Sequence, residues 1–337
     1  MRPVHNPPNP YEPTTLEWLD EPPPARLEVF EEEARRVLTE NKSPDLPFRF
    51  SLNPYRGCVH ACAYCYARPT HQYLGFGAGT DFDRKIVVKV NAPEALLREV
   101  SRPSFRRDVV ALSGNTDCYQ PLEAGYRLTR RCLEVLEGHD VPVGVITKSA
   151  LVARDADVLA RMRAVVTLSV PFADDDAARR IEPWAARPSR RLEALRRLSE
   201  AGVETGVAIA PIIPGLNDAD IPEILERAKE AGATRAFMTL LRLPREVHPV
   251  FTERLEEAFP DRYRRVLHAL EEVRGGKHNE SRFGSRFVGR GPRWQIIERV
   301  FEQHAKRLGL STREKDASPV TEVTRLSSKR PRQGELF

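Results

Sequence analysis

The sequence predicts an α/β fold in which parallel strands, each followed by a helix, form a barrel or an open barrel. Apolar runs such as VVAL, VGVI, VVTL and VAIA lack strict polar alternation, which is typical of strands buried on both faces. Helix-like segments separate these runs, so that strands and helices alternate. The connections are short, and repeated strand–helix units of this kind favour parallel strands with right-handed crossovers.

The elements follow in order along the chain. Residues 48–53 (FRFSLN) form a short strand that ends at a cysteine-rich loop. We expect further strands over residues 85–90, 108–114, 141–149, 164–170, 203–215 and 234–244. The helices expected between them cover residues 93–100, 123–138, 151–162, 189–202 and 218–232. In such folds the chemistry gathers at the C-terminal ends of the strands, so functional residues are sought there.

The flanks differ in composition from this central part, which we place at residues 46–245. Residues 1–45 are rich in proline and acids and are predicted to be an extended arm with one helix, over residues 26–40. Residues 246–310 are predicted to be a helical, arginine-rich extension. The polar tail at 311–337 lacks periodicity, so it is predicted to be disordered.

Composition excludes few classes of partner. The net charge is +5, but 48 acids nearly balance 53 bases, which is weak support for a polyanionic partner. Of the bases, 44 are arginines; arginine suits phosphate and carboxylate recognition, although a coding bias gives the same skew. No apolar run reaches the roughly 18 residues of a membrane span. The N-terminus has no apolar segment resembling a signal peptide, and we therefore expect a cytoplasmic protein that does not bind membranes.

Three of the five cysteines lie close together, in the segment NPYRGCVHACAYCYARP. A disulfide framework is not expected in a reducing compartment, so Cys58, Cys62 and Cys65 indicate metal or redox chemistry. Each of the four irons of a [4Fe–4S] cluster needs one external ligand, and three thiolates leave one iron open for a substrate or cofactor. The alternative is a zinc site with His60 or His71 as fourth ligand, although the second ligand pair usual for structural zinc is missing.

The C-x3-C-x2-C spacing, with aromatic Tyr64 before the third cysteine, resembles the signature of radical S-adenosylmethionine enzymes. The resemblance implies a partial (β/α)6 barrel and S-adenosylmethionine bound at the open iron. It also implies a 5′-deoxyadenosyl radical formed by one-electron cleavage of that cofactor, and a reducing partner such as flavodoxin or ferredoxin. The cofactors carry that chemistry, and the protein orients them and excludes water.

The ends of three predicted strands resemble those of the spore photoproduct lyase-like branch of this family. The segments are SGNTDCYQPLE, VITKS and TLSV. Carried over by position, the resemblance implies that Thr116, Asp117, Lys148 and Ser169 contact S-adenosylmethionine. Tyr66, directly after the third cysteine, is a further candidate for the same pocket. A lysine that ends an apolar strand at a barrel mouth favours a carboxylate partner over packing.

One departure from this branch concerns the hydrogen donor. In spore photoproduct lyase, which repairs a thymine dimer in DNA, a cysteine precedes the matching hydroxyl residue and aspartate. Here the stretch is Gly114-Asn115-Thr116-Asp117, without a thiol. Cys118 is a candidate donor from a shifted position, and the alternative is a small buried residue.

A further segment bears on the substrate. SRFGSRFVGRGPRW (281–294) carries Arg282, Arg286 and Arg290 among aromatic and glycine residues. Arginines supply phosphate contacts and aromatic rings stack on unpaired bases, so these residues are candidates for nucleic-acid binding. The alternative is a loop that caps the open end of the barrel, with its arginines paired to barrel carboxylates.

The leading hypothesis is thus a radical enzyme acting on a nucleic acid or a nucleoside-containing substrate. A second hypothesis keeps the radical chemistry but places it on a peptide or a small metabolite. A third is a zinc-stabilised nucleic-acid-binding protein. The sequence leaves the reaction and the oligomeric state open.

Overall fold

Six parallel strands form the centre of the structure, a computed structural model that describes residues 6, 9–11, 26–162 and 164–312. Their spatial order is β3 (Phe50–Leu52), β6 (Val110–Leu112), β7 (Val143–Thr147), β8 (Val165–Ser169), β9 (Glu204–Ile212) and β10 (Arg235–Leu240). β2 (Leu38–Glu40) joins antiparallel at one edge, and β11 (Ser311–Thr312) joins parallel at the other. Within the described residues these two edge strands do not pair, so the barrel is open. The predicted α/β fold is confirmed.

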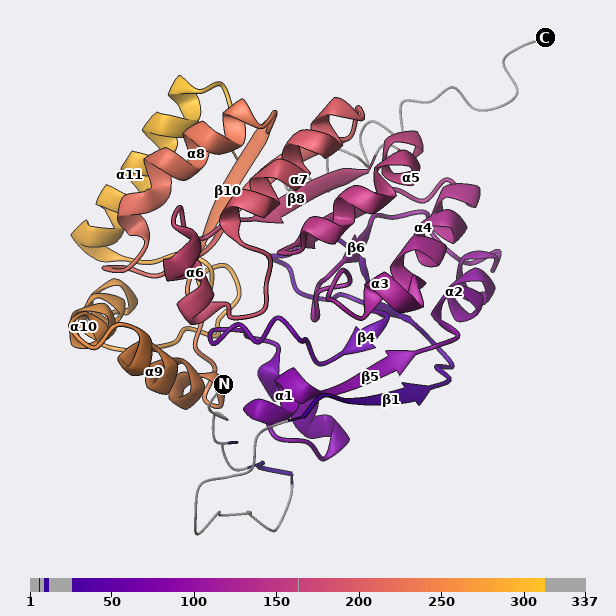
Figure 1. Cartoon of the computed structure of the whole chain (residues 1–337), viewed down its shortest axis with the longest axis horizontal. Coiled ribbons are helices and arrows are strands. Elements are labelled where there is room, and N and C mark those ends of the chain that lie inside the picture. The colour runs from indigo at the N-terminus through magenta and orange to yellow at the C-terminus, as the bar shows by residue number, and fades with distance from the viewer. Residues whose placement is uncertain (1–5, 7–8, 12–25, 163, 313–337) are drawn as a thin grey trace.

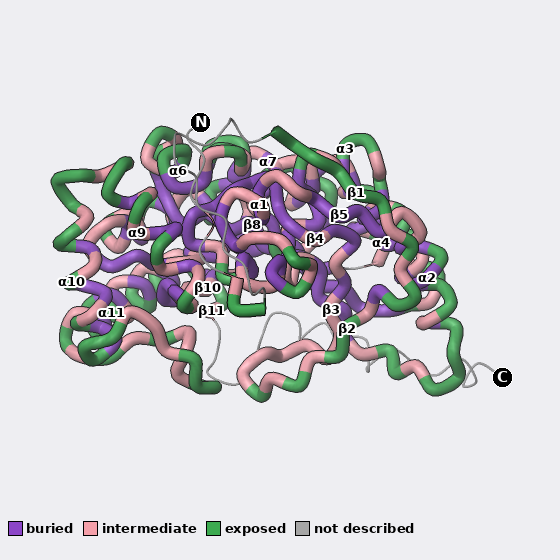
Figure 2. The backbone as a smooth tube through the Cα atoms, turned by 90° about the horizontal axis from the view of Figure 1, so that it is seen from below, coloured by how far each residue is buried: buried purple, intermediate pink, exposed green. Residues whose placement is uncertain are grey.

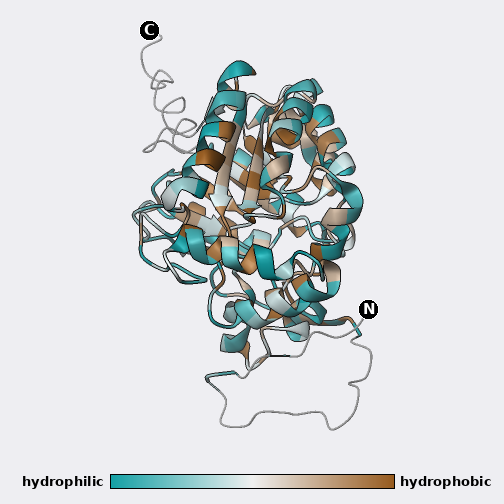
Figure 3. Cartoon of the chain, turned by 90° about the vertical axis from the view of Figure 1, so that its left-hand side faces the viewer, coloured by the Kyte–Doolittle hydropathy of each residue, from teal (hydrophilic) through white to brown (hydrophobic). Residues whose placement is uncertain are grey.

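Helices cover the outer face of this sheet (Figure 1). They are α2 (Ala92–Val100), α4 (Leu128–Gly138), α5 (Ala156–Arg161), α7 (Pro188–Glu200) and α8 (Ile221–Glu230). Helix α7 shows why: Leu192, Leu195 and Leu198 recur at helical spacing and are buried, and the helix packs against β8 and β9. Figure 3 shows the apolar residues gathered on the strands and the polar ones on the outer helices.

A second, three-stranded sheet flanks the barrel. It consists of β1 (Glu28–Glu32), β5 (Lys85–Lys89) and β4 (Tyr55–Arg56), in that order. The predicted strand at 85–90 therefore exists but lies outside the barrel. The reason is local: β5 pairs antiparallel with β4, which directly precedes the cysteine loop. Two short helices, η1 (Arg68–Leu74) and α1 (Thr80–Arg84), connect that loop to β5.

The helix predicted over residues 26–40 is wrong, because this segment forms strands β1 and β2. A helix on the protein surface is stabilised mainly by an apolar face buried against the core, but here only Val37 is buried. Instead, β1 pairs along its whole length with β5. Its side chains also find partners, as Tyr126 donates a hydrogen bond to Glu31. Tertiary pairing overrides the helix propensity of this glutamate-rich segment.

Three other predicted helices are divided into two segments. The one over 123–138 divides into α3 (Glu123–Tyr126) and α4 at Arg127, whose φ is +52°. The buried carboxylate of Glu123 accepts hydrogen bonds from the backbone N–H groups of Thr129 and Arg130, which start α4. The helix over 151–162 begins as η2 (Ala150–Asp155) before α5, and α8 is likewise preceded by η3 (Asp218–Asp220). Helix α6 (Asp175–Ile181), capped by Asp174, was not predicted.

The C-terminal part adds α9 (Val247–Ala258), α10 (Tyr263–Arg274) and α11 (Gly291–Arg307) beside the β10 edge (Figure 1). Residues 311 and 312 form β11 and are not part of a disordered tail; the rest of that prediction, residues 313–337, lies outside the described residues. The domain boundaries at 45, 245 and 310 stay predictions. No described helix combines the length and the apolar character that crossing a bilayer requires.

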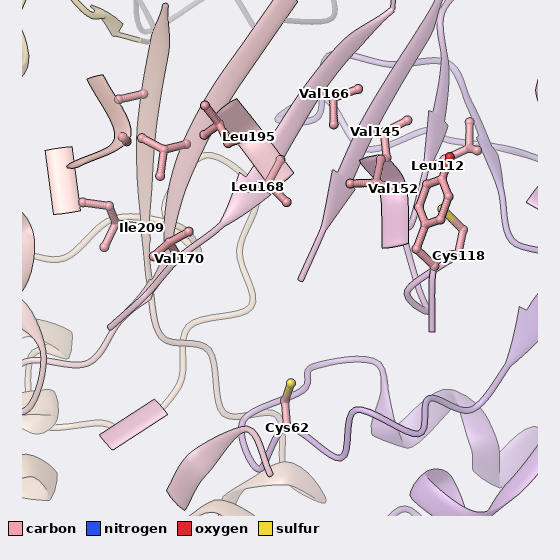
Figure 4. Close-up of a cluster of buried hydrophobic side chains, with 14 of the residues drawn as sticks. Cys62, Leu112, Cys118, Val145, Val152, Val166, Leu168, Val170, Leu195 and Ile209 are labelled. Atoms are coloured by element: carbon pink, nitrogen blue, oxygen red, sulfur yellow. The ribbon is translucent and has the colours of Figure 1, made fainter. Parts of the chain in front are cut away.

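The core lies between the barrel strands and the surrounding helices. Figure 2 shows the buried backbone concentrated in the middle of the molecule, with exposed residues on the outer helices and loops. The close-up in Figure 4 shows the side chains of Val166, Leu168 and Leu195 packed together between β8 and the helical layer. Leu168 is fully buried, whereas Ile146 in the neighbouring strand is 42% exposed and lines a cavity.

We expect Leu168→Ala to lower the free energy of unfolding by about 2–5 kcal/mol, since it removes buried methyl groups and leaves a void. Ile146→Ala in β7 is the matched control, and its loss should be clearly smaller because its side chain is already partly hydrated. Urea denaturation followed by circular dichroism measures both. Equal losses for the two variants would contradict the assigned core.

Candidate cofactor site

A cavity of about 390 Å³ opens at the C-terminal ends of the barrel strands. Its wall combines the three clustered cysteines with polar residues from the ends of β6, β7, β8 and β10. The lining residues that matter below are Cys58, Cys62, Cys65, His60, Tyr64, Tyr66, Thr116, Asp117, Lys148, Ser169, Arg242, Arg286 and Phe287. The structure thus brings most of the predicted site residues to one place, whereas Arg282, Arg290 and Cys118 do not line the cavity.

The cysteine loop has a backbone that holds its three thiols on one wall. Gly57 has φ +76°, and a Cβ there would lie 2.9 Å from the Phe82 carbonyl oxygen, so the loop requires glycine at this position. Ala61, between the first two cysteines, also has a left-handed φ of +55°. The fully buried Arg68 donates two hydrogen bonds to the Cys62 carbonyl oxygen and pairs with Asp83 at 2.9 Å.

The three thiols are suited to a metal cluster. All three cysteines are free, and Cys58 and Cys62 are buried. Burial raises the pKa of Cys62 well above its usual value, and burial together with Cys58 raises that of Cys65 to about 11. Because thiolates are the ligand form, a bound cation must supply the free energy that keeps these two groups deprotonated. The donor set of three sulfurs on one cavity wall therefore fits a [4Fe–4S] cluster with one open iron.

A zinc site would need His60 or His71 as its fourth ligand. His71 Nε2 lies 2.8 Å from the Lys85 carbonyl oxygen, and His71 is not among the cavity residues. His60 does line the cavity, but its Nδ1 lies 3.4 Å from the Asp117 carboxylate. No group of three His, Cys, Asp or Glu side chains in the described ranges is arranged to hold a single metal ion.

Asp117 organises the strand ends rather than facing the cavity freely. Its carboxylate accepts hydrogen bonds from the Thr147 hydroxyl at 2.7 Å and from the Lys148 backbone N–H at 2.8 Å. Burial raises its pKa, but the His60 ring and these two donors outweigh that effect, and the pKa falls to about 2. Asp117 is therefore an anion that ties the ends of β6 and β7 to the cysteine loop through His60.

Lys148 lies at the centre of a second network. Its Nζ donates to the Ser169 hydroxyl at 2.9 Å and lies 5.5 Å from the centre of the Tyr64 ring. Burial lowers the pKa of this amine. Below it, the fully buried Glu182 carboxylate accepts hydrogen bonds from the Tyr64 hydroxyl and the Arg191 guanidinium, and it lies 4.0 Å from Lys148 Nζ.

Of the remaining predicted residues, Thr116 and Tyr66 line the cavity and Cys118 does not. The Thr116 hydroxyl donates to the Tyr55 carbonyl oxygen at 2.8 Å, and the Tyr66 hydroxyl donates to the Gly114 carbonyl oxygen at 2.6 Å. Cys118 is fully buried, with its sulfur 3.1 Å from the Ser113 hydroxyl. Figure 4 shows it beside Leu112 and Val152, apart from Cys62 on its loop. The structure therefore places Cys118 in the core, behind the cavity wall to which Ser113 belongs, and not on the wall itself.

The arginine-rich loop closes one side of the cavity mouth. Arg286 forms a two-fold ion pair with Asp45, at 2.8 and 2.6 Å, which joins the N-terminal arm to this loop. Arg282 and Arg290 both pair with Glu280 instead. The buried Arg274 donates hydrogen bonds to four carbonyl oxygens, those of Leu241, Ser285, Arg286 and Val288. The predicted alternative of a capping loop matches this arrangement, except that the carboxylates come from the arm (Asp45) and from the extension itself (Glu280), not from the barrel.

Sequence reasoning missed three residues that shape this site. Arg242 follows β10 at the cavity mouth, and the rule that selected Lys148, a charged residue at the end of an apolar strand, would have found it. Glu182 and Arg191 have no such signal, because one lies after a short helix and the other on a helix with several arginines. Only the fold shows that this carboxylate and this guanidinium meet in the interior.

Known proteins resemble the chain over most of its length. A model of the Radical SAM superfamily matches residues 52–228, just over half of the chain. An uncharacterized protein of Mycobacterium tuberculosis is 38% identical over 238 residues, covering 67% of this chain and 70% of the relative. An uncharacterized protein of Methanocaldococcus jannaschii is 28% identical, covering 71% and 86%. Spore photoproduct lyase complexed with dinucleoside spore photoproduct has a similar fold, with a TM-score of 0.62, 17% identity and coverage of 84% and 81%.

We expect Arg191→Met to lower the free energy of unfolding by about 3–5 kcal/mol, because it leaves the Glu182 carboxylate buried without its partner. The matched control is Arg196→Met on the same helix. Arg196 pairs with Glu193 and Glu200 on the exposed surface, where such pairs contribute little. Chemical denaturation of both variants tests the difference, and a destabilisation no greater for Arg191→Met than for the control would rule out a stabilising role for the buried pair.

Proposed function

The chain belongs to the radical SAM superfamily, and on that premise we propose that it is an enzyme acting on a nucleic acid or a nucleoside-containing substrate. Members of the superfamily use a [4Fe–4S] cluster and S-adenosylmethionine. The observation that carries the proposal is the single cavity that Cys58, Cys62 and Cys65 share with the polar ends of the barrel strands.

The cysteines are the proposed ligands of the cluster. When bound, the cluster and S-adenosylmethionine supply one-electron cleavage of the sulfonium and a 5′-deoxyadenosyl radical that abstracts hydrogen. The chain itself holds the thiols in place through Gly57 and Arg68. It also excludes water, since the loop and the strand ends that surround the sulfurs are largely buried.

The polar strand ends are the proposed contacts for S-adenosylmethionine. Lys148 Nζ supplies a positive charge suited to a carboxylate, and Ser169, within hydrogen-bond distance of it, supplies a hydroxyl group. Tyr64, Tyr66 and Thr116 complete the lining of this side of the cavity. Asp117 does not contact the cofactor in this proposal, because its carboxylate accepts hydrogen bonds from the Thr147 hydroxyl and the Lys148 backbone N–H. It is a positioning residue for the end of β7.

The substrate proposal is supported by the cavity mouth and by the fold. Tyr66, Arg242 and Arg286 line the cavity, and the Phe283 ring contacts Arg286. Tyr66 is 49% and Phe283 58% exposed, and such surfaces suit unpaired bases and phosphates. Spore photoproduct lyase, which has the similar fold, binds a dinucleoside photoproduct. We do not extend its dimer repair to this chain, because Gly114 stands in place of the hydrogen-donating thiol and Cys118 faces the core. An external reductant such as flavodoxin or ferredoxin is part of the proposal.

Replacing one ligand tests the cofactor assignment. Anaerobically reconstituted protein should be brown, absorb near about 400 nm and hold about four irons per chain. Cys62→Ala should lose the cluster and form no 5′-deoxyadenosine with dithionite and S-adenosylmethionine. Cys132→Ala is the matched control, since this cysteine is buried in α4 away from the cavity, and it should keep both. Production of 5′-deoxyadenosine by Cys62→Ala would overturn the assignment, as would a colourless protein that holds one zinc.

The substrate class is tested by product analysis. Single-stranded DNA incubated with the reduced enzyme and S-adenosylmethionine should stimulate 5′-deoxyadenosine formation and yield an altered nucleoside after digestion, detected by mass spectrometry. RNA and a peptide mixture serve as parallel substrates. Stimulation and product formation only with the peptide mixture would assign the enzyme to the peptide class instead.

A further inference from the structure

The cavity mouth contains one arginine, Arg242, whose guanidinium has no ion-pair partner among the described residues. Arg242 follows β10 and lines the cavity, yet its guanidinium makes no hydrogen bond or ion pair with any described residue. Its Nε is buried from water without an acceptor. Burial and the nearby Arg286 lower its pKa, which reflects a charge held in an unfavourable place. An arginine offers five N–H donors, so a half-buried guanidinium whose Nε is buried without an acceptor indicates a missing acceptor.

The other described cations that line the cavity have partners. Lys148 Nζ donates to Ser169 and to the Ala210 carbonyl oxygen. Arg286 is neutralised by Asp45, and His60 lies against Asp117. The Asp45 carboxylate acts on Arg242 through its charge, but both of its oxygens already accept hydrogen bonds from Arg286. Among the residues that the structure describes, no carboxylate forms an ion pair with Arg242.

Aromatic rings hold this guanidinium in place. Its central carbon lies 5.7 Å from the centre of the Tyr66 ring and 5.5 Å from that of Phe287. Arg286 continues the row, 4.7 Å from Phe287 and 5.0 Å from Phe283. These cation–π contacts fix the position of a charge without using its N–H donors. A planar, pre-positioned guanidinium with free donors is suited to two-point recognition of a phosphate or carboxylate.

The surroundings favour a phosphate. Tyr66 and Phe283, at the two ends of this row, expose about half of their side chains or more. An unpaired base would find a stacking surface on either ring, with its phosphate beside Arg242. A free carboxylate would use the charge but not the rings. We propose that Arg242 binds a backbone phosphate of a single-stranded nucleic acid whose bases stack on the exposed rings of the mouth. This inference rests on the proposed function, since it names the substrate class of the same cavity.

Binding of a fluorescent single-stranded DNA oligonucleotide of about twelve nucleotides to the full-length, cluster-loaded protein tests the inference. Arg242→Gln should weaken binding about 10- to 100-fold, the range for a lost charge-assisted contact. It should also reduce the slope of log Kd against log salt by about 0.7, the share of one phosphate on a single strand. Arg242→Lys keeps the charge but loses the two-point geometry. Its affinity for the oligonucleotide should therefore lie between that of the unaltered protein and that of Arg242→Gln.

The matched control is Arg190→Gln on the exposed face of α7, which should bind as the unaltered protein does. Iron content and circular dichroism establish that each variant is folded and loaded. The affinity for S-adenosylmethionine, measured in the same samples, separates substrate from cofactor. Arg242→Gln would overturn the inference if it weakened cofactor binding alone, if it bound the oligonucleotide as tightly as the control, or if it weakened binding with no change in salt slope.

Failure of this inference is distinguishable from failure of the proposed function. Oligonucleotide binding is read without reductant and does not depend on cleavage of S-adenosylmethionine. An enzyme that forms 5′-deoxyadenosine but binds oligonucleotides independently of Arg242 retains the radical chemistry and loses this substrate site. Absence of oligonucleotide binding by the unaltered protein, with cofactor cleavage intact, has the same consequence, and tight binding of an acidic peptide through Arg242 would assign the anion as a carboxylate.

Discussion

The site depends on one fully buried carboxylate, that of Glu182. It accepts hydrogen bonds from Tyr64 of the cysteine loop and from Arg191 of the helical layer, and it lies beside Lys148 at the end of β7. An isolated charge in this position would be strongly unfavourable, so the three partners are held around it. The cysteine loop is thereby fixed to the same barrel edge that presents the polar strand ends. The cysteine loop and the polar strand ends, which are far apart in the sequence, therefore line the same cavity.

At the mouth of the cavity, a buried arginine has the role that the Glu182 carboxylate has below it: its hydrogen bonds join separate parts of the chain. Arg274 is buried and donates hydrogen bonds to three backbone carbonyl oxygens of the arginine-rich loop, and Arg286 joins that loop to Asp45 of the N-terminal arm. Arm and extension, which flank the barrel in the sequence, thus meet over its open end. Within this arrangement Arg242 keeps its charge and its donors for a ligand, while the surrounding arginines stabilise the protein itself.

Sequence patterns predicted those parts whose cause is local. Apolar runs identified the barrel strands, and the spacing of three cysteines identified the loop whose thiols line the cavity, because each pattern reports a property of adjacent residues. Sequence patterns did not predict the parts of the structure that depend on contacts between residues far apart in the chain. Residues 26–40 have helix propensity but find a strand partner in β5, and the pairing of Glu182 with Arg191 depends on how α6 and α7 pack. Arg282 and Arg290 were candidates for nucleic-acid binding, with a capping loop as the alternative, and the fold pairs both with Glu280 of the same extension.

We propose that a cluster held by the three cysteines would keep one iron without a protein ligand, and that S-adenosylmethionine would bind there, in the cavity that Lys148 and Ser169 also line. Electron paramagnetic resonance of the reduced, reconstituted protein tests it most directly, with spectra recorded before and after addition of S-adenosylmethionine. We expect the cluster signal to change, because the cofactor would bind the iron that has no cysteine ligand. A signal that stays the same at saturating S-adenosylmethionine would show that this iron is closed and would refute the proposed site.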